Sequence, residues 1–135
     1  MLLVDTSVLV NVLRDSTGSC ADRLFAEIGD DEIAVMRIIE LELLAGARDD
    51  HEWARLRAYM LERPMLEMGL DTWAAAARIF FDLRRAGQTV RKLMDCCIAQ
   101  VALDNDVMLV HDDRDFVAVA EVRPLKHLRL DMAKT

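Results

Sequence analysis

Several acidic residues of this sequence occupy positions where packing alone would favour an apolar side chain. Asp5 directly follows an apolar run at the start of the chain, and Asp113 and Asp115 come just after a second apolar run. Asp95 shares its helical face with isoleucine and alanine. Carboxylates without neighbouring His or Cys clusters suit Mg²⁺ or Mn²⁺ better than zinc. Two such ions about 3.5–4 Å apart can activate a water molecule and stabilise the leaving oxygen of a phosphodiester. Convergence of these acids therefore predicts a metal site for phosphodiester hydrolysis.

Each of these acids also has a structural interpretation. Asp5 begins the polar triplet 5–7, which is typical of a helix cap, and capping is compatible with metal binding. Asp95 lies in a first helical turn, where the helix dipole favours a solvated acid, although its apolar neighbours place it toward the core. The acidic run 112–115 is of a kind usually found in surface loops. Only convergence with the other acids at the strand ends would make it functional.

A further acid comes from the helix predicted over 38–47, which contains two glutamates. Glu42 shares its helix face with apolar and small residues instead of a basic partner, which is unusual for a solvated glutamate. Glu40 is a competitor, because it lies in the same helix with two leucines beside it. Helical periodicity does not decide between them.

The net charge of the chain, taken alone, argues against a nucleic-acid partner. With 24 Asp and Glu against 17 Lys and Arg, the formal charge is −7, whereas phosphate binding ordinarily needs a basic face. Acids gathered in one pocket are neutralised by bound cations. Setting aside five acids leaves 19 acidic against 17 basic residues, a formal charge of −2; these five are Asp5, Glu42, Asp95, Asp113 and Asp115. The outer surface is then expected to be nearly neutral.

The elements that must position these acids are short apolar strands separated by helices. We expect strands over 2–4, 33–36, 107–110 and 125–130, the last at a sheet edge, and helices over 8–14, 20–28, 38–47, 51–62, 71–86 and 93–103. Apolar stripes on two of these helices are Trp53, Leu56 and Met60, and Trp73, Ala76, Ala77, Phe80 and Leu83. The alternation predicts one α/β domain over residues 1–135 with a mainly parallel sheet. Ligands of such sheets collect at the carboxyl ends of the strands, where Asp5 and the acids after Val110 would lie.

Composition excludes several other classes of protein. A sequence that is 53% hydrophobic and 30% charged is not disordered, and no apolar run approaches the length of a membrane span. The first residues lack a basic leader and a cleavage site, so we expect a cytoplasmic protein. Three cysteines, two of them adjacent at 96 and 97, indicate buried reduced thiols instead of a disulfide framework.

In their order and spacing, four segments resemble the PIN-domain nucleases, and among these the VapC-type toxins of toxin–antitoxin pairs. The segments are Leu3-Val4-Asp5-Thr6-Ser7-Val8, Glu42-Leu43-Leu44-Ala45-Gly46, the helix that opens at Asp95, and Val110-His111-Asp112-Asp113-Arg114-Asp115-Phe116. The resemblance covers nearly the whole chain. It implies a three-layer α/β/α sandwich, a single PIN domain over 1–135, and an endoribonuclease that uses Mg²⁺, for which Mn²⁺ can substitute.

The resemblance also implies roles for individual residues. The catalytic, metal-binding acids would be Asp5, Glu42, Asp95 and Asp113, with Asp115 as an additional metal ligand. It selects Glu42 over Glu40, and Thr6 and Ser7 would support the carboxylates through their hydroxyl groups. His111 departs from the family pattern, which has Thr or Ser there. We expect it to be an exposed loop residue, although a proton-donor or phosphate-binding role is conceivable.

Partners follow from the same resemblance. Arg91 and Lys92 are the best candidates for holding the RNA backbone, with Arg78, Arg84 and Arg85 as weaker ones. A VapB-like antitoxin would cover the acidic pocket, and a homodimer or a hetero-oligomer with that antitoxin is expected. Four residues fit either a groove for an amphipathic helix or ordinary core packing: Trp53, Tyr59, Met60 and Met65.

Three rival interpretations remain. The first is a PIN nuclease of RNA processing that has no antitoxin. The second is a catalytically inactive PIN scaffold, against which the retention of the acids argues. The third is a phospho-accepting receiver domain, which would need a lysine at a late strand end, and Lys126 is its only candidate.

Overall fold

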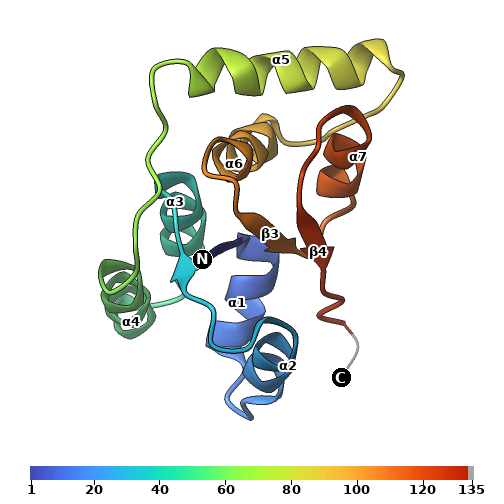
Figure 1. Cartoon of the computed structure of the whole chain (residues 1–135). Coiled ribbons are helices and arrows are strands. Elements are labelled where there is room, and N and C mark those ends of the chain that lie inside the picture. Colours follow the sequence, from blue (N-terminus) through green and yellow to red (C-terminus); the bar gives the residue numbers. More distant parts are fainter. Residues whose placement is uncertain (134–135) are drawn as a thin grey trace.

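The computed structural model describes residues 1–133 and contains a four-stranded, entirely parallel sheet between layers of helices (Figure 1). The strands are β1 (Leu2–Val4), β2 (Ile33–Ala34), β3 (Met108–His111) and β4 (His127–Arg129). Their order is β2-β1-β3-β4, with Val4 opposite Val110 and Val110 opposite Leu128. The two central strands thus end side by side, and the residues after them meet at one edge of the sheet.

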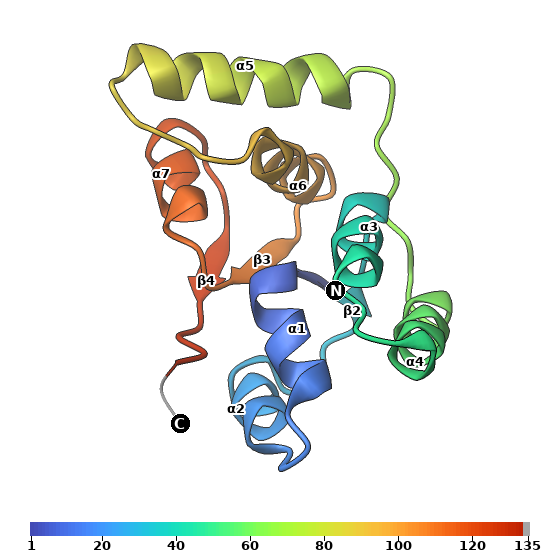
Figure 2. The same ribbon diagram turned by 180° about the vertical axis from the view of Figure 1, so that it is seen from behind.

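Seven helices surround the sheet in the described part of the chain. They are α1 (Thr6–Arg14), α2 (Ser19–Ile28), α3 (Arg37–Ala45), α4 (Asp50–Leu61), α5 (Thr72–Arg85), α6 (Leu93–Asp104) and α7 (Arg114–Val122). In both ribbon views α1 and α2 lie on one side of the sheet, and α6 and α7 lie on the other with α5 packed outside them (Figures 1 and 2). α3 and α4 lie beside β2. This arrangement confirms the predicted three-layer α/β/α sandwich.

The apolar character of the strands explains this layering. Every residue of β1 is buried, and β3 is buried apart from its first residue. Strands that are buried on both faces need helices on both sides, which is the ordinary arrangement of a parallel sheet. The core between sheet and helices includes Leu3, Ile39 and Ile98, all without exposed surface.

The sequence did not predict α7. The acidic run 112–115 was interpreted as a loop or as a set of ligands, and no helix was expected after it. In the structure Asp113 is the N-cap residue of α7, Asp115 lies in its first turn, and Phe116 and Val119 are buried. An N-cap aspartate followed by an acidic first turn is a helix-start signal. The cluster of acids obscured that signal.

Two other expectations about side chains were wrong or incomplete. Trp73 was placed in the apolar core stripe, but 60% of its surface is exposed, and the buried residues of α5 are Thr72, Ala76, Ile79 and Leu83. Trp53 is likewise half exposed, although Leu56 and Met60 on the same helix are buried. The three cysteines are buried free thiols, as expected. Within residues 1–133, no helix has the length and apolar character needed to cross a membrane.

Candidate metal centre

Asp5 lies at the carboxyl end of β1, where its side chain caps α1. Its Oδ2 accepts hydrogen bonds from the Ser7 amide at 3.0 Å and from the Ser7 hydroxyl at 2.6 Å. The side chain is 4% exposed. Burial raises the pKa of Asp5 above its usual range, against the hydrogen bonds from Ser7, which lower it. Capping and metal binding are therefore compatible, because both hydrogen bonds from Ser7 go to one carboxylate oxygen.

Asp113 repeats this arrangement at the end of β3. Its Oδ1 accepts the Asp115 amide at 2.9 Å and thereby caps α7. Asp115 is 1% exposed, and its Oδ2 accepts the Arg91 amide at 3.3 Å. The run after β3 is thus not a solvated loop: two of its acids face the inside of the molecule, next to the end of β1.

Asp95 is buried on the first turn of α6, with only 2% of its surface exposed. Its Oδ2 is buried and has no hydrogen-bond partner. Burial, and then the charges of Asp5 and Asp113, raise the pKa of Asp95 to about 7. An unpartnered carboxylate oxygen in a buried site is costly unless a cation or proton compensates it.

The structure separates the two glutamates of α3. Glu40 pairs with Arg57 at 2.8 Å and with Arg37 at 3.7 Å. Glu42 lies on the acidic side instead, where its Oε1 accepts the Thr6 hydroxyl at 3.2 Å. Burial and the neighbouring charge of Asp5 raise the pKa of Glu42. Glu42 is therefore the glutamate beside the other acids, as the resemblance implied.

The tightest group consists of Asp95, Asp113 and Asp115, whose ligand atoms all lie within 4.8 Å of one another. Asp5 and Glu42 lie outside this group but are close enough to raise the pKa of Asp95. Buried carboxylates with an unpartnered oxygen, and no thiol or imidazole in the group, fit a hard divalent cation. A cation of this kind retains waters, through which the outer acids could act without moving.

Two basic residues border the acids from the loop before α6. Arg91 approaches Asp113 at 3.8 Å, and the positive charge of Lys92 opposes the rise in the pKa of both Glu42 and Asp95 without cancelling it. Both cations are exposed. The weaker candidates lie on the outer helix α5, where Arg78 pairs with Asp82 at 3.0 Å. Arg91 and Lys92 are thus the predicted basic residues that the structure brings to the acids.

His111 does not match the expectation of an exposed loop residue. It is the last residue of β3 and is fully buried. Burial, and then the proximity of His127, lower the pKa of His111 to about 4. Sequence patterns gave no sign of this pairing, because the partner imidazole lies 16 residues away on β4.

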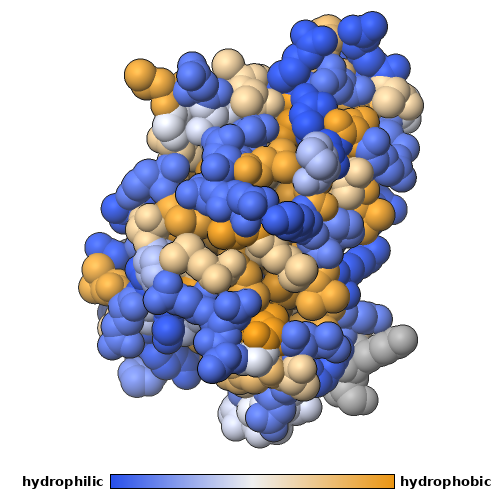
Figure 3. Space-filling view, in the orientation of Figure 1, coloured by the Kyte–Doolittle hydropathy of each residue, from blue (hydrophilic) through white to orange (hydrophobic). Residues whose placement is uncertain are grey.

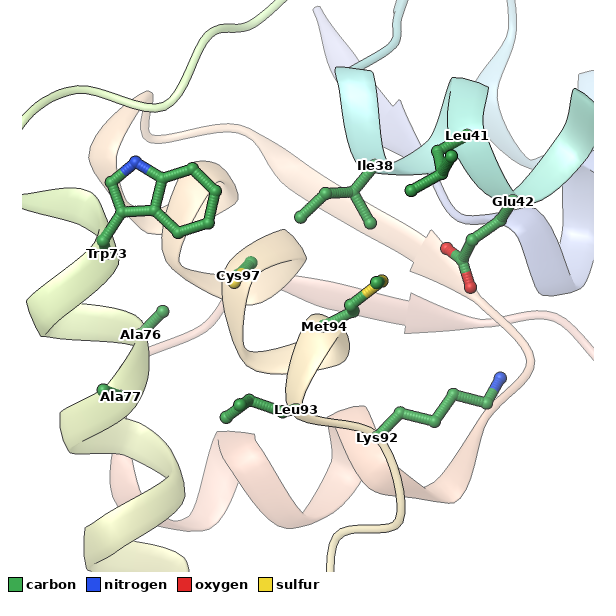
Figure 4. A pocket seen from close by; sticks show the side chains of 10 residues that line it. All are labelled: Ile38, Leu41, Glu42, Trp73, Ala76, Ala77, Lys92, Leu93, Met94 and Cys97. Atoms are coloured by element: carbon green, nitrogen blue, oxygen red, sulfur yellow. The ribbon is translucent and has the colours of Figure 1, made fainter. Parts of the chain in front are cut away.

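An apolar cleft of about 620 Å³ opens beside the acids, between α3, α5 and α6 (Figure 4). Glu42 and Lys92 lie at the same end of it. Exposed apolar side chains are also visible near the middle of the face in Figure 3, with polar side chains around them. The residues that line the cleft are Ile38, Leu41, Glu42, Trp73, Ala76, Ala77, Lys92, Leu93, Met94 and Cys97.

This cleft is not the groove considered from the sequence. That groove was expected from Trp53, Tyr59, Met60 and Met65. Met60 is 1% exposed and belongs to the core, and Tyr59 and Met65 pack against that core. Core packing is therefore the correct interpretation for these three. The accessible apolar surface near the acids is provided by α3, α5 and α6 instead.

Comparison with known proteins agrees with this geometry. The PIN domain matches residues 2–122. The VapC ribonuclease Mb1587 of Mycobacterium bovis is 38% identical over 132 residues, which cover 93% of this chain and 96% of that protein. VapBC2 of Rickettsia felis, solved bound to a promoter DNA fragment, has a TM-score of 0.72 at 16% identity and covers 96% of this chain and 98% of its own. VapBC-5 of Mycobacterium tuberculosis has a TM-score of 0.69 at 22% sequence identity, and the match covers 96% of this chain and 98% of that one. The two structures establish the shared fold.

A parallel sheet with buried carboxylates at its carboxyl edge defines an α/β protein with an acidic cluster that could hold a cation. The sequence matches narrow this class. The chain belongs to the PIN-domain family, and within it to the VapC ribonucleases. PIN nucleases depend on a metal, and Asp95, Asp113 and Asp115 form an acidic cluster able to bind one.

Proposed function

We propose that this chain is a Mg²⁺-dependent endoribonuclease, acting as the toxin of a toxin–antitoxin pair, in which residues 1–135 form one PIN domain. The observation that carries the proposal is the buried Oδ2 of Asp95, which has no hydrogen-bond partner and faces a cluster with Asp113 and Asp115. A buried carboxylate of this kind stays ionised where a cation compensates it and otherwise takes up a proton. The 38% identity to a VapC ribonuclease over nearly the full length supports RNA as the substrate.

The proposed metal ligands are Asp95, Asp113 and Asp115 in the tight group, with Asp5 and Glu42 at its border. Mg²⁺, or Mn²⁺ in its place, would supply an acidified water and charge stabilisation at the leaving oxygen. The cleaved phosphodiester is itself an anion, so the carboxylates alone would repel it. The cation is therefore required for substrate binding as well as for hydrolysis.

The residues around the acids hold and orient these groups. The Ser7 hydroxyl donates to one oxygen of Asp5, and the Thr6 hydroxyl donates to Glu42. Both contacts support the role that the resemblance implies for these hydroxyl groups. Arg91 and Lys92 lie on the exposed side of the centre and carry the charge needed to hold the RNA backbone.

Cleavage of a labelled RNA tests the enzymatic proposal. Purified protein should cut the RNA with Mg²⁺ or Mn²⁺ present, and EDTA or Asp5→Asn should abolish the cut. Cleavage that survives both treatments would overturn the proposal. A folded protein that binds metal but never cuts RNA would support the inactive scaffold instead.

The proposed partner is a VapB-like antitoxin that covers the centre. Two observations support it: the fold is shared with VapBC complexes, and an apolar cleft runs up to Glu42 and Lys92. A toxin that cuts cellular RNA and the antitoxin that covers its centre would meet in the cytoplasm. Where a small antitoxin gene lies next to this one, co-expression of the two should give a hetero-oligomer whose mass and lost RNase activity report the pairing. A chain that neither pairs nor loses activity would favour the RNA-processing nuclease.

The receiver interpretation finds no support in the structure. Lys126 pairs with Asp106 at 2.7 Å and precedes β4, so it lies at the amino end of that strand. The acids lie at the carboxyl ends of the strands. A phosphoryl group on any of these acids would therefore be distant from the lysine that a receiver needs.

A further inference from the structure

The imidazole of His111 is the only buried group at the end of β3 in the described chain for which the proposed chemistry has no role. It is fully buried and packs against Phe116 of α7, with ring centroids 5.0 Å apart. On its other side it stacks on His127 of β4, at 5.1 Å and an interplanar angle of 25°. A polar ring in such a position is ordinarily held by hydrogen bonds on both nitrogens.

Both ring nitrogens of His111 do have partners. The Asp113 amide donates to Nδ1 at 3.1 Å, and Nε2 lies 2.9 Å from Nδ1 of His127. A backbone amide can only donate, so Nδ1 of His111 carries no proton. The neutral ring then carries its proton on Nε2 and donates it to Nδ1 of His127. One backbone amide thus determines the tautomers of the two rings, which we call the imidazole pair.

The hydrogen bond from the Asp113 amide to His111 lies between the end of β3 and the start of α7. Residues 112 and 113 are irregular backbone between β3 and α7, and Asp113 has to present its carboxylate on two sides. Its Oδ1 caps α7 through the Asp115 amide, while its side chain remains within the group that includes Asp95. Rotation of this peptide would misdirect Asp113 and the first turn that carries Asp115.

We propose that His111 is a positioning residue for the metal centre, which orients Asp113 by accepting its amide hydrogen at Nδ1 and is itself oriented by His127. Groups that orient metal ligands without touching the metal typically change affinity by about 10–100-fold when they are lost. The effect of the imidazole pair on metal binding rests on the proposed function. The hydrogen bonds of the pair are observed independently of it.

Two isosteric variants separate positioning from packing. In His111→Asn the amide oxygen can occupy the Nδ1 position and accept the Asp113 amide, whereas in His111→Gln the amide group reaches only the Nε2 position. Both variants lose the same ring stacking on Phe116 and His127. We expect Mn²⁺ affinity, measured by the spin resonance of free Mn²⁺, to fall about 10–100-fold in His111→Gln and to stay within about threefold of wild type in His111→Asn.

Urea unfolding of both variants provides the control for folding. Equal stability with unequal Mn²⁺ affinity is the expected result, because only the acceptor at Nδ1 differs. Equal Mn²⁺ affinity in the two folded variants would overturn the proposal, as would a variant pair whose affinities follow their unfolding free energies alone.

Nitrogen NMR of the imidazole rings tests the hydrogen bonds without metal. The expected spectrum shows His111 with bare Nδ1 and protonated Nε2, and the Nε2 shift should change in His127→Leu. A protonated Nδ1 on His111 would overturn the proposal whatever the metal affinity. If wild-type protein bound no Mn²⁺ while the tautomers were as expected, the proposed function would fail and the hydrogen-bonded pair would stand.

Discussion

The hydroxyl oxygen of Ser7 accepts a hydrogen bond from the backbone amide of Asp112 at 2.9 Å, across 105 residues of sequence. The same hydroxyl donates to Asp5 Oδ2 at 2.6 Å. Ser7 therefore links the carboxyl ends of β1 and β3, the two central strands, and connects one acid of the candidate centre to the segment that carries two others. This side chain adds to the backbone hydrogen bond from the Asp5 amide to the Val110 carbonyl, which joins the same two strand ends.

Replacing this hydroxyl should affect both stability and metal binding. In Ser7→Ala, Asp5 loses a hydrogen bond that lowers its pKa, and the Asp112 amide loses its acceptor. We expect unfolding in urea to cost about 1–3 kcal/mol less than in wild type, and Mn²⁺ binding to require higher pH because Asp5 is harder to ionise. Ser7→Thr, which keeps the hydroxyl, is the matched control. Wild-type Mn²⁺ affinity in Ser7→Ala at all pH values would contradict this role.

Asp95 should make the metal-free protein less stable as pH rises from about 4 to about 7, whereas His111, whose pKa is lowered to about 4, contributes in the opposite sense over part of this range. Asp95 has a pKa of about 7 in the folded chain against an ordinary value of 3.8, so the folded state binds more protons than the unfolded state in this interval. Where the folded state binds more protons than the unfolded state, the free energy of unfolding decreases as pH rises. Above pH 7 the buried charge should cost a few kcal/mol, at most about 4.

Asp95→Asn removes this cost and provides the test. In EDTA the variant should be more stable than wild type at pH 8, and the difference should vanish near pH 4. Mn²⁺ should stabilise wild type at pH 8 and leave the variant nearly unchanged. Thermal unfolding at both pH values measures all of these quantities, and a variant less stable than wild type at pH 8 in EDTA would show that Asp95 is not a destabilising anion.

The two glutamates of α3 form a natural pair for mutation. Glu42 lies with Thr6 and the acids, whereas Glu40 is held by Arg57 and Arg37. Glu42→Gln should reduce RNA cleavage at saturating Mg²⁺ by about 10–100-fold, by analogy with other losses at metal sites. Glu40→Gln should reduce stability slightly and leave cleavage within about twofold. Equal cleavage by the two variants would remove Glu42 from the centre.

The fold and most of the acids could be predicted from the sequence because their signals are local. An apolar run followed by a polar triplet identified β1 and the start of α1, and apolar neighbours placed Asp95 toward the core. Parallel strands then bring their carboxyl ends to one edge, which is sufficient to expect Asp5 near Asp113.

The remainder depended on contacts between distant segments. Helical periodicity does not distinguish Glu40 from Glu42. The ion pair between Arg57 on α4 and Glu40 does. His111 reads as a loop residue until β4 pairs with β3 and brings His127 to it. Trp73 follows an apolar stripe, but in the described chain it lines the cleft between α3, α5 and α6 and 60% of its surface is exposed. Secondary-structure propensity and periodicity contain no information about these contacts between distant segments.

The last prediction concerns the basic residues before α6. If Arg91 and Lys92 hold RNA phosphates, each alanine variant should weaken binding to all RNA sequences alike and reduce the slope of log affinity against log salt by about 0.7. Arg78 is the matched control, since it is exposed on the outer helix α5 and pairs with Asp82. Binding can be measured with Ca²⁺ in place of Mg²⁺, so that RNA stays intact. Because Arg91 and Lys92 lie beside the acids, loss of either cation should weaken RNA binding more than loss of Arg78. An unchanged salt slope in both Arg91→Ala and Lys92→Ala, with Arg78→Ala reducing it, would move the RNA path from the acidic edge to α5.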